Sequence, residues 1–305
     1  MNESVNADSE NPSQQQLSSL LEHYQNGRLN EAEKLALSIT NEFPKHQFAW
    51  KVLGAVLKQT GRVIDSLTAM QKSVDLMLQD AEAHNNLGLT LQELGRLDEA
   101  EASLNQAIAL KPAFVEAHYN LGITLKELGR LDEAAASYDK TIALKSDYAE
   151  AHNNLGITLQ ELGRLEDAEA SCNRAIALKP DYAEAMLNLS FTQNYMNDLE
   201  AEIVSLQNVL QLDSDNYGLR AGVNLAICNF LEGDFTESKK HLLAATKIQE
   251  KTSSKSKNER VYWRYLSNIL KWHKNKYLGV KKGKNDKKSF VVGESHSLSS
   301  HHLCI

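Results

Sequence analysis

The sequence predicts an all-α protein, a solenoid of stacked helix-turn-helix repeats that ends in a C-terminal covering helix. Three observations predict this class: a sequence block recurs every 34 residues, its apolar residues have helical spacing, and glycines take fixed places in successive blocks. The block is most regular in AEAHNNLGLTLQELGRL (81–97) and AEAHNNLGITLQELGRL (149–165), which differ only at Leu89 and Ile157. A period of this length is typical of an array in which each unit packs on the next.

Each repeat is expected to form two helices joined by a tight turn. In the unit that begins at residue 81, Leu87 and Leu91 mark the apolar face of the first helix, and Ala100 and Leu104 mark that of the second. Residues 1–12 are polar and are expected to be a disordered N-terminus. The same register gives seven units over residues 13–252, namely 13–46, 47–80, 81–114, 115–148, 149–182, 183–216 and 219–252.

Two sets of glycines recur in the repeat, and each set has its own structural reason. The first set stands at the turn between the helices, where a left-handed residue is needed, and asparagine replaces glycine once. It comprises Gly27, Gly61, Gly95, Gly129, Gly163, Asn197 and Gly233. The second set lies inside the first helix, at a cost of about 1 kcal/mol each relative to alanine, which predicts close packing on the small residues Ala100, Ala134 and Ala168 of the second helix. Its members are Gly54, Gly88, Gly122 and Gly156.

Together these features resemble the tetratricopeptide repeat family. The family pattern has a Leu-Gly pair in the first helix, a glycine at the turn, a small residue in the second helix and a proline at its end, and here these are NLG, ELGRL, EA and KP. The resemblance covers about residues 13–252. It implies a right-handed superhelical solenoid in which the first helices line a concave groove. The sixth unit departs from the pattern, with Ser190 for the glycine and Glu202 for the small residue.

The resemblance places the groove at the second, fifth, sixth and ninth positions of each unit. Asparagine recurs at the sixth position, and its amide both donates and accepts, so a row of asparagines can bind a peptide backbone. Such a row is similar to the asparagine ladder of O-linked N-acetylglucosamine transferases. The alternative is that these amides bond only to neighbouring backbone. The candidate peptide-binding residues are Asn85, Asn86, Asn120, Asn153, Asn154, Asn188 and Asn224, with Tyr119 and Phe191 as apolar anchors.

The charges at these positions indicate the kind of partner. From residue 81 to 216 no Lys or Arg stands there, whereas the second position holds Glu82, Glu116, Glu150 and Glu184. A protein or peptide partner is therefore expected to be neutral or basic rather than an acidic C-terminal tail. The alternative is that the glutamates are only solvated residues near a helix start. Self-association through the open ends of the array is compatible with either interpretation.

Other chemistry is not predicted. His84, His118 and His152 recur every 34 residues, but successive repeats place them on different helices, so we predict packing histidines rather than metal ligands. Three cysteines at unrelated spacings suggest neither a disulfide framework nor a metal cluster, and Cys172 is expected to be a small core residue. The sequence thus predicts no catalytic residue, no metal, no cofactor and no nucleic-acid partner. A polar start and no long apolar run predict a cytoplasmic protein without a transmembrane segment.

The C-terminal part has a different composition. Residues 1–250 carry 20 Lys or Arg against 37 Asp or Glu, whereas residues 251–288 carry 13 against 2. Residues 258–279 have helical spacing and are expected to cover the last repeat, although their Trp and Lys also suit an anionic surface. Residues 280–288 are expected to be a basic linker.

The last segment, 289–305, contains SFVVGESHS, which resembles the first block of SGNH or GDSL hydrolases, with Ser295 at the nucleophile position. Too few residues follow for a parallel sheet, so we expect the truncated start of an α/β domain. The prediction is a non-catalytic interaction scaffold that binds an extended peptide or partner protein. The alternative is the targeting or regulatory arm of an SGNH-like hydrolase or a transferase whose catalytic domain is missing from this chain.

Overall fold

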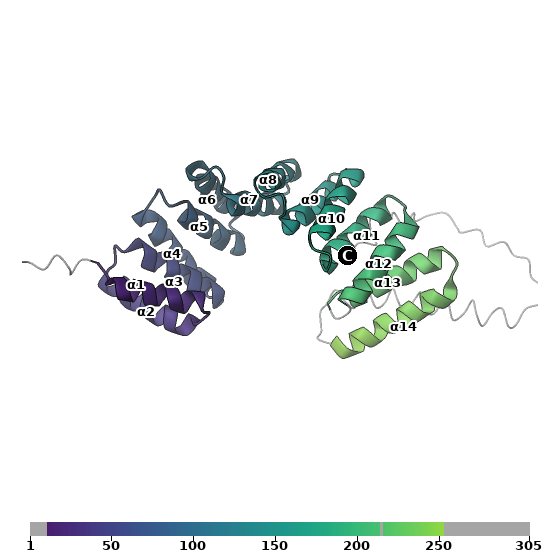
Figure 1. Ribbon diagram of the computed structural model, residues 1–305, viewed down its shortest axis with the longest axis horizontal. Coiled ribbons are helices and arrows are strands. Elements are labelled where there is room, and N and C mark those ends of the chain that lie inside the picture. Colours follow the sequence, from purple (N-terminus) through teal and green to yellow (C-terminus); the bar gives the residue numbers. More distant parts are fainter. Residues whose placement is uncertain (1–10, 214–215, 253–305) are drawn as a thin grey trace, which may run out of the picture. The chain divides into compact units, whose positions relative to one another are not determined.

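The computed structural model describes residues 11–213 and 216–252, and these residues form 14 helices and no strand (Figure 1). The predictions for residues 1–10, 258–279, 280–288 and 289–305 lie outside the described residues. The helices are α1 (Gln14–Gln25), α2 (Leu29–Glu42), α3 (Gln47–Gln59), α4 (Val63–Leu76), α5 (Ala81–Glu93), α6 (Leu97–Leu110), α7 (Val115–Glu127), α8 (Leu131–Leu144), α9 (Ala149–Glu161), α10 (Leu165–Leu178), α11 (Ala183–Tyr195), α12 (Leu199–Leu212), α13 (Gly218–Leu231) and α14 (Phe235–Thr252).

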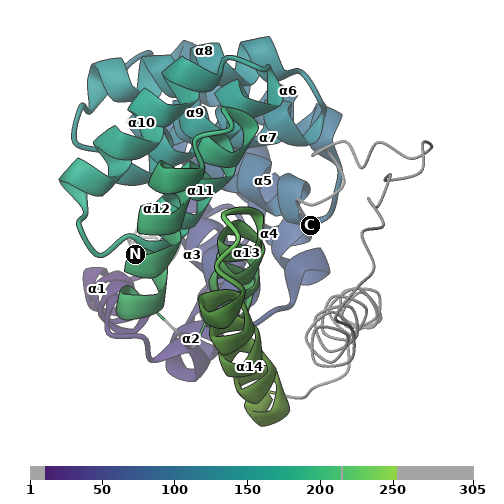
Figure 2. The ribbon, with the colours of Figure 1, turned by 90° about the vertical axis from the view of Figure 1, so that its right-hand side faces the viewer.

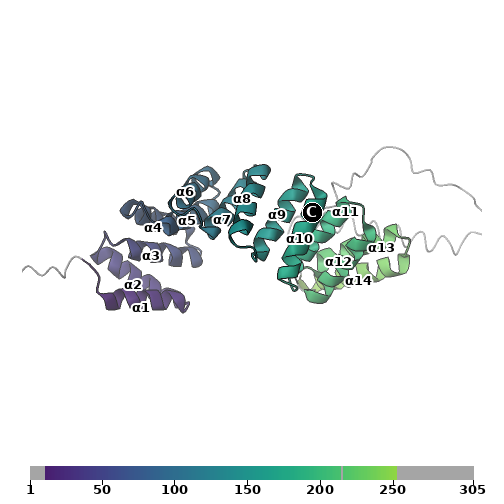
Figure 3. The ribbon, with the colours of Figure 1, turned by 45° about the horizontal axis from the view of Figure 1, so that its top comes forward.

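The chain divides into two compact units, 1–158 and 159–305, with the boundary inside α9. In the first unit each odd-numbered helix packs on the helix that follows it, as α3 packs on α4, α5 on α6 and α7 on α8 (Figure 3). In the second unit α11 packs on α12, and α13 packs on α14 (Figure 2). Adjacent pairs also pack on one another, for example α4 on α5 and α12 on α13. The predicted all-α repeat fold is confirmed.

The turns within the helix pairs are left-handed, as the sequence predicted. Six turn glycines have positive φ, and Asn197, which replaces glycine in the sixth unit, has a φ of 58°. After α5 the Gly95 N–H donates to the carbonyl of Gln92, and the Arg96 N–H donates to that of Leu91 at 2.9 Å. These bonds satisfy carbonyls that the end of the helix would leave unpaired.

The glycines inside the first helices lie against large side chains. A Cβ added at Gly122 would stand 2.6 Å from Cε1 of Tyr138, and one added at Gly88 would stand 2.7 Å from Cγ of Leu104. The sequence had placed the small residue Ala100 opposite Gly88, but the nearest atoms belong to Leu104, and Ala100 contributes its carbonyl oxygen at 3.3 Å. Because alanine is small, the two helices lie close together. The larger residue one turn later then fills the space next to the glycine.

Repeated ring N–H groups tether the loops that precede the first helices. The Nε2 atoms of His84 and His118 lie 3.0 Å from the carbonyl oxygens of Leu78 and Pro112, and that of His152 lies 3.2 Å from the carbonyl of Ser146. One repeat earlier, Trp50 Nε1 donates to the carbonyl of Pro44 at 2.9 Å. A carbonyl only accepts, so Nε2 of each histidine carries the hydrogen. These histidines have a structural role, and the described residues hold no group of three or more His, Cys, Asp or Glu that suits a metal ion.

The tether predicts a difference between two aromatic substitutions at His84. We expect His84→Phe to lower the free energy of unfolding by about 1 kcal/mol, because the carbonyl of Leu78 loses its donor. His84→Trp restores a ring N–H in the manner of Trp50 and is expected to recover part of this loss. Urea unfolding followed by circular dichroism measures both variants, and equal losses would show that the ring N–H does not contribute to stability.

The sixth unit has several buried polar residues in addition to its apolar core. Gln193 and Ser205 are buried and bonded to each other, with Ser205 Oγ 2.8 Å from Gln193 Oε1. Glu202 is only 3% exposed and accepts a hydrogen bond from Asn194 Nδ2 at 3.0 Å. Burial raises the pKa of Glu202, although the hydrogen bonds from Asn194 and Cys228 act in the opposite direction. Cys172 in α10 is fully buried and takes the position that Leu104 has in α6, so it is a small core residue, as the sequence predicts.

Candidate functional site

The candidate groove residues of the first unit are joined between neighbouring repeats. Asn120 Nδ2 in α7 donates to Asn85 Oδ1 in α5 at 2.9 Å, and Asn154 Nδ2 in α9 donates to the Tyr119 hydroxyl in α7 at 3.0 Å. In both pairs the fifth position of one repeat meets the sixth position of the next. The structure therefore links these side chains to one another. The ladder hypothesis predicts bonds to a peptide and its alternative predicts bonds to the backbone, so neither predicts these pairs.

The exposure of these amides differs along the first unit. Asn85, Asn120 and Asn153 are buried, whereas Asn86 and Asn154 are half-buried and remain accessible. An amide has two N–H groups and two acceptor positions on its oxygen, so one inter-repeat bond leaves capacity for a ligand. Asn86 and Asn154 are thus the candidate asparagines of this unit whose side chains remain accessible.

Tyr119 is packed as well as hydrogen-bonded. Its ring stacks on Tyr148 with centroids 4.9 Å apart, and it lies 6.0 Å from the ring of the buried Tyr138. Lys145 Nζ lies 4.8 Å from the centre of the Tyr148 ring. Burial raises the pKa of Tyr148, and the charges of Glu150 and Glu116 raise it further. Tyr119 therefore belongs to a fixed aromatic cluster beside two groove glutamates.

The second unit contains the other candidates, Asn188, Phe191 and Asn224, all of which are half-buried. The guanidinium carbon of Arg220 in α13 lies 5.8 Å from the centre of the Phe191 ring in α11. Arg220 holds the second position of the last repeat, where four earlier repeats have glutamate. The sequence predicts no Lys or Arg at the groove positions of residues 81–216, and Arg220 lies beyond that range.

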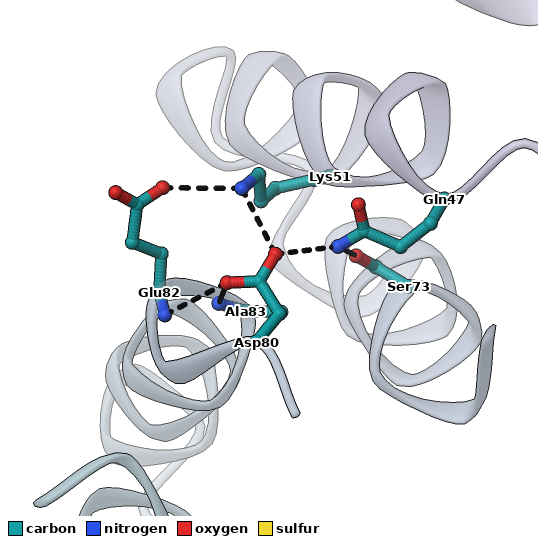
Figure 4. A network of polar contacts seen from close by, with 6 residues as sticks. All are labelled: Gln47, Lys51, Ser73, Asp80, Glu82 and Ala83. Atoms are coloured by element: carbon teal, nitrogen blue, oxygen red, sulfur yellow. Dashed lines mark hydrogen bonds and ion pairs between the residues drawn. The ribbon is translucent and has the colours of Figure 1, made fainter. Parts of the chain in front are cut away.

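A second basic residue lies at a groove position of the first unit. Lys51 takes the fifth position of α3, and its Nζ contacts Asp80 Oδ2 at 3.0 Å and Glu82 Oε2 at 3.1 Å (Figure 4). Gln47 Nε2 donates to the same oxygen of Asp80 at 2.8 Å. The other carboxylate oxygen of Asp80 accepts from the backbone N–H groups of Glu82 and Ala83, which caps α5. This network joins two repeats and neutralises the lysine.

The network shifts the pKa values of its two half-buried charges in opposite directions. Burial lowers the pKa of Lys51, but the hydrogen bonds and charges of Asp80 and Glu82 outweigh burial and raise it overall. For Asp80, burial raises the pKa, and the contacts with Lys51, Ala83 and Gln47 outweigh it and lower it overall. Both groups therefore stay charged at neutral pH.

Among the described helices none is both long and apolar enough to cross a membrane.

Comparisons with known proteins agree with this repeat architecture. Family models described as tetratricopeptide repeat match residues 47–113, 85–149 and 119–183. No curated protein matches the chain. These matches concern the repeats, and they give no support to the resemblance with O-linked N-acetylglucosamine transferases or with SGNH hydrolases.

Several solved structures are similar to the chain in fold. YrrB, titled a TPR protein with an unusual peptide-binding site, is 20% identical with a TM-score of 0.51, over 60% of this chain and 93% of that one. MamA from Desulfovibrio magneticus RS-1 is 21% identical with a TM-score of 0.53, over 57% of this chain and 97% of that one. A tetratricopeptide repeat protein from Parabacteroides merdae is 16% identical with a TM-score of 0.59, over 86% of this chain and all of that one. Residues 47–183 therefore match tetratricopeptide repeat models, and the chain shares the fold of these solved repeat proteins.

Proposed function

We propose that the chain is a non-catalytic interaction scaffold that binds an extended peptide, or an extended segment of a partner protein, along its first helices. The observation that carries the proposal is the inter-repeat pairing of groove side chains, Asn85 with Asn120 and Tyr119 with Asn154. The similarity in fold to YrrB, whose title names a peptide-binding site, supports it. Two buried cysteines without a disulfide, Cys172 and Cys228, suit the reducing conditions of the cytoplasm.

The pairing has a direct consequence for binding. A side chain that is already held by its neighbour loses less conformational entropy when a ligand binds, which raises affinity. The remaining donors and acceptors of the amides can bond to the N–H and C=O groups of an extended peptide whatever its sequence. Sequence preference would then come from the charged residues around the amides.

The proposal predicts that substitution of the accessible asparagines weakens peptide binding. Random peptides of roughly 12 residues, long enough in extended form to pass several helices, are displayed on phage and selected on the full chain. A selected peptide is labelled and titrated by fluorescence anisotropy. We expect Asn86→Ala with Asn154→Ala to weaken its binding by about five- to fiftyfold, as for the loss of two hydrogen bonds.

The matched control replaces two exposed asparagines of second helices, Asn105 in α6 and Asn173 in α10, by alanine. These residues lie outside the groove positions, so we expect less than about a twofold change in affinity. Equal losses in the two double variants would place the binding site elsewhere. A selection that enriches no peptide would contradict the proposed function itself.

A further inference from the structure

The first unit contains an internal example of how a groove glutamate binds a cation. Glu82, at the second position of α5, is 65% exposed, yet Lys51 Nζ from the preceding first helix lies 3.1 Å from its Oε2 (Figure 4). Lys51 stands 31 residues before Glu82. A lysine at the fifth position of one repeat thus reaches the second-position carboxylate of the next repeat.

The next repeat keeps the carboxylate and lacks the cation. Thirty-one residues before Glu116 stands Asn85, which is shorter than lysine, uncharged and already bonded to Asn120. Phe114 takes the place that Asp80 has before α5. Glu116 is exposed, and no ion pair reaches it from the described residues. Lys111, on the loop before α7, instead has its Nζ 4.6 Å from the centre of the Phe114 ring.

We infer that Glu116 binds a lysine or arginine side chain of the bound peptide, at the place that Lys51 occupies beside Glu82. The inference rests on the proposed function and adds a basic residue to the ligand. Asn120 lies one helical turn after Glu116 on the same face of α7. Asn120 is buried and its Nδ2 bonds to Asn85, so the exposed carboxylate of Glu116 is the group that meets the basic side chain.

The repeat that follows also has a glutamate at the second position. Glu150 in α9 stands 31 residues after Tyr119, and Tyr148 takes the place of Asp80. Glu150 and Glu116 both act on the pKa of Tyr148, so the two carboxylates lie near one aromatic ring. A peptide that runs along the first helices of this unit therefore meets glutamates in successive repeats. The neighbouring Lys111 and Lys145 lie over the rings of Phe114 and Tyr148.

The test uses the peptides selected on the full chain. We expect Lys and Arg to be enriched in them relative to the starting library. In the tightest binder each basic residue is then changed to glutamine, singly. For one of these positions, Glu116→Gln in the protein should weaken the parent peptide by about three- to fivefold at low salt but leave the glutamine peptide unchanged.

Two further variants make the result specific. Asp132→Asn removes the same charge from an exposed residue of a second helix, α8, and is expected to change affinity less than twofold, as is usual for a distant exposed charge. Asn85→Lys copies the Lys51 arrangement, so its own lysine should pair with Glu116 and weaken basic peptides at least as much as Glu116→Gln. Its thermal unfolding is recorded alongside, because residue 85 is buried.

The outcomes separate the inference from the proposed function. Peptides that bind without Lys or Arg enrichment, or equal effects of Glu116→Gln and Asp132→Asn, overturn the inference and leave the scaffold function standing. No enriched peptide at all overturns both. If Asn85→Lys unfolds, the exposed Glu116→Gln variant still decides.

Discussion

Replacement of Gly122 by alanine is expected to lower the free energy of unfolding by about 1–3 kcal/mol, although alanine is the better helix former by about 1 kcal/mol. The added Cβ would stand 2.6 Å from Cε1 and 2.8 Å from Cδ1 of Tyr138. Tyr138 is 1% exposed, and its ring packs against Tyr119, so it has little freedom to move away. The backbone of α7 or α8 must therefore shift.

The same change at other glycines gives a graded series. At Gly88 the added Cβ meets Leu104, and at Gly54 it meets the flexible end of Met70, so we expect smaller losses in that order. At Gly222 the nearest atom is the Cβ of Ala245 at 3.4 Å, an ordinary contact. Gly222→Ala should be neutral, or stabilising by up to about 1 kcal/mol.

Urea unfolding followed by the helical circular dichroism signal measures these variants. An unchanged midpoint for Gly122→Ala, with Gly222→Ala also unchanged, would show that the helices of the repeat separate at no cost. That result would remove the packing explanation for the recurrent glycine.

Replacement of Glu202 by glutamine is expected to stabilise the second unit by about 1 kcal/mol or more at about pH 8. Glu202 occupies the position of the small residues Ala100, Ala134 and Ala168, where its carboxyl group is almost fully buried. Glutamine keeps an oxygen that can accept from Asn194 Nδ2 and removes the charge. The gain comes from the cost of burying a carboxylate.

The pH dependence has a defined sign. Burial raises the folded-state pKa of Glu202 above the ordinary value of 4.5, so the proton binds more tightly in the folded protein. The contribution of this group to stability is complete below the unfolded pKa and is lost as the pH rises through the folded pKa. Glu202→Gln should therefore gain most, relative to the parent chain, on the alkaline side of this range.

The control is Glu200→Gln, because Glu200 is an exposed residue of the same helix, α12. Thermal unfolding is recorded from acid to alkaline pH for the three proteins. A Glu202→Gln curve that runs parallel to the parent curve at all pH values would show that Glu202 does not titrate above 4.5 in the folded state. Equal shifts for both variants would point to net charge rather than burial.

The pairing of groove residues required the structure. The sequence predicts separate contact residues, whereas the structure bonds Asn85 to Asn120 and Tyr119 to Asn154. No sequence pattern indicates that the fifth position of one repeat bonds to the sixth position of the next. Residues 35 apart become partners only through the stacking of one repeat on another, and that geometry is not a property of either helix alone.

Lys51 is a basic residue at a groove position that the sequence-based prediction does not include. The predicted groove charges concern residues 81–216, where the repeats are most regular, and Lys51 lies in an earlier repeat. A comparison of fifth-position residues over all repeats would have found it. Its ion pairs with Asp80 and Glu82 would still have been missed, because they depend on how α3 and α5 approach each other.

The sequence by itself determined the helical class, the repeat period and the left-handed turns, including Asn197. These features follow from local physics: apolar spacing fixes a helix, and a residue that tolerates positive φ fixes where the helix ends. Only the tertiary structure decided what each repeated residue contacts, such as Tyr138 above Gly122 or a loop carbonyl beside His84. Such contacts arise from the spacing and angle between helices, which depend on all the side chains that pack between them.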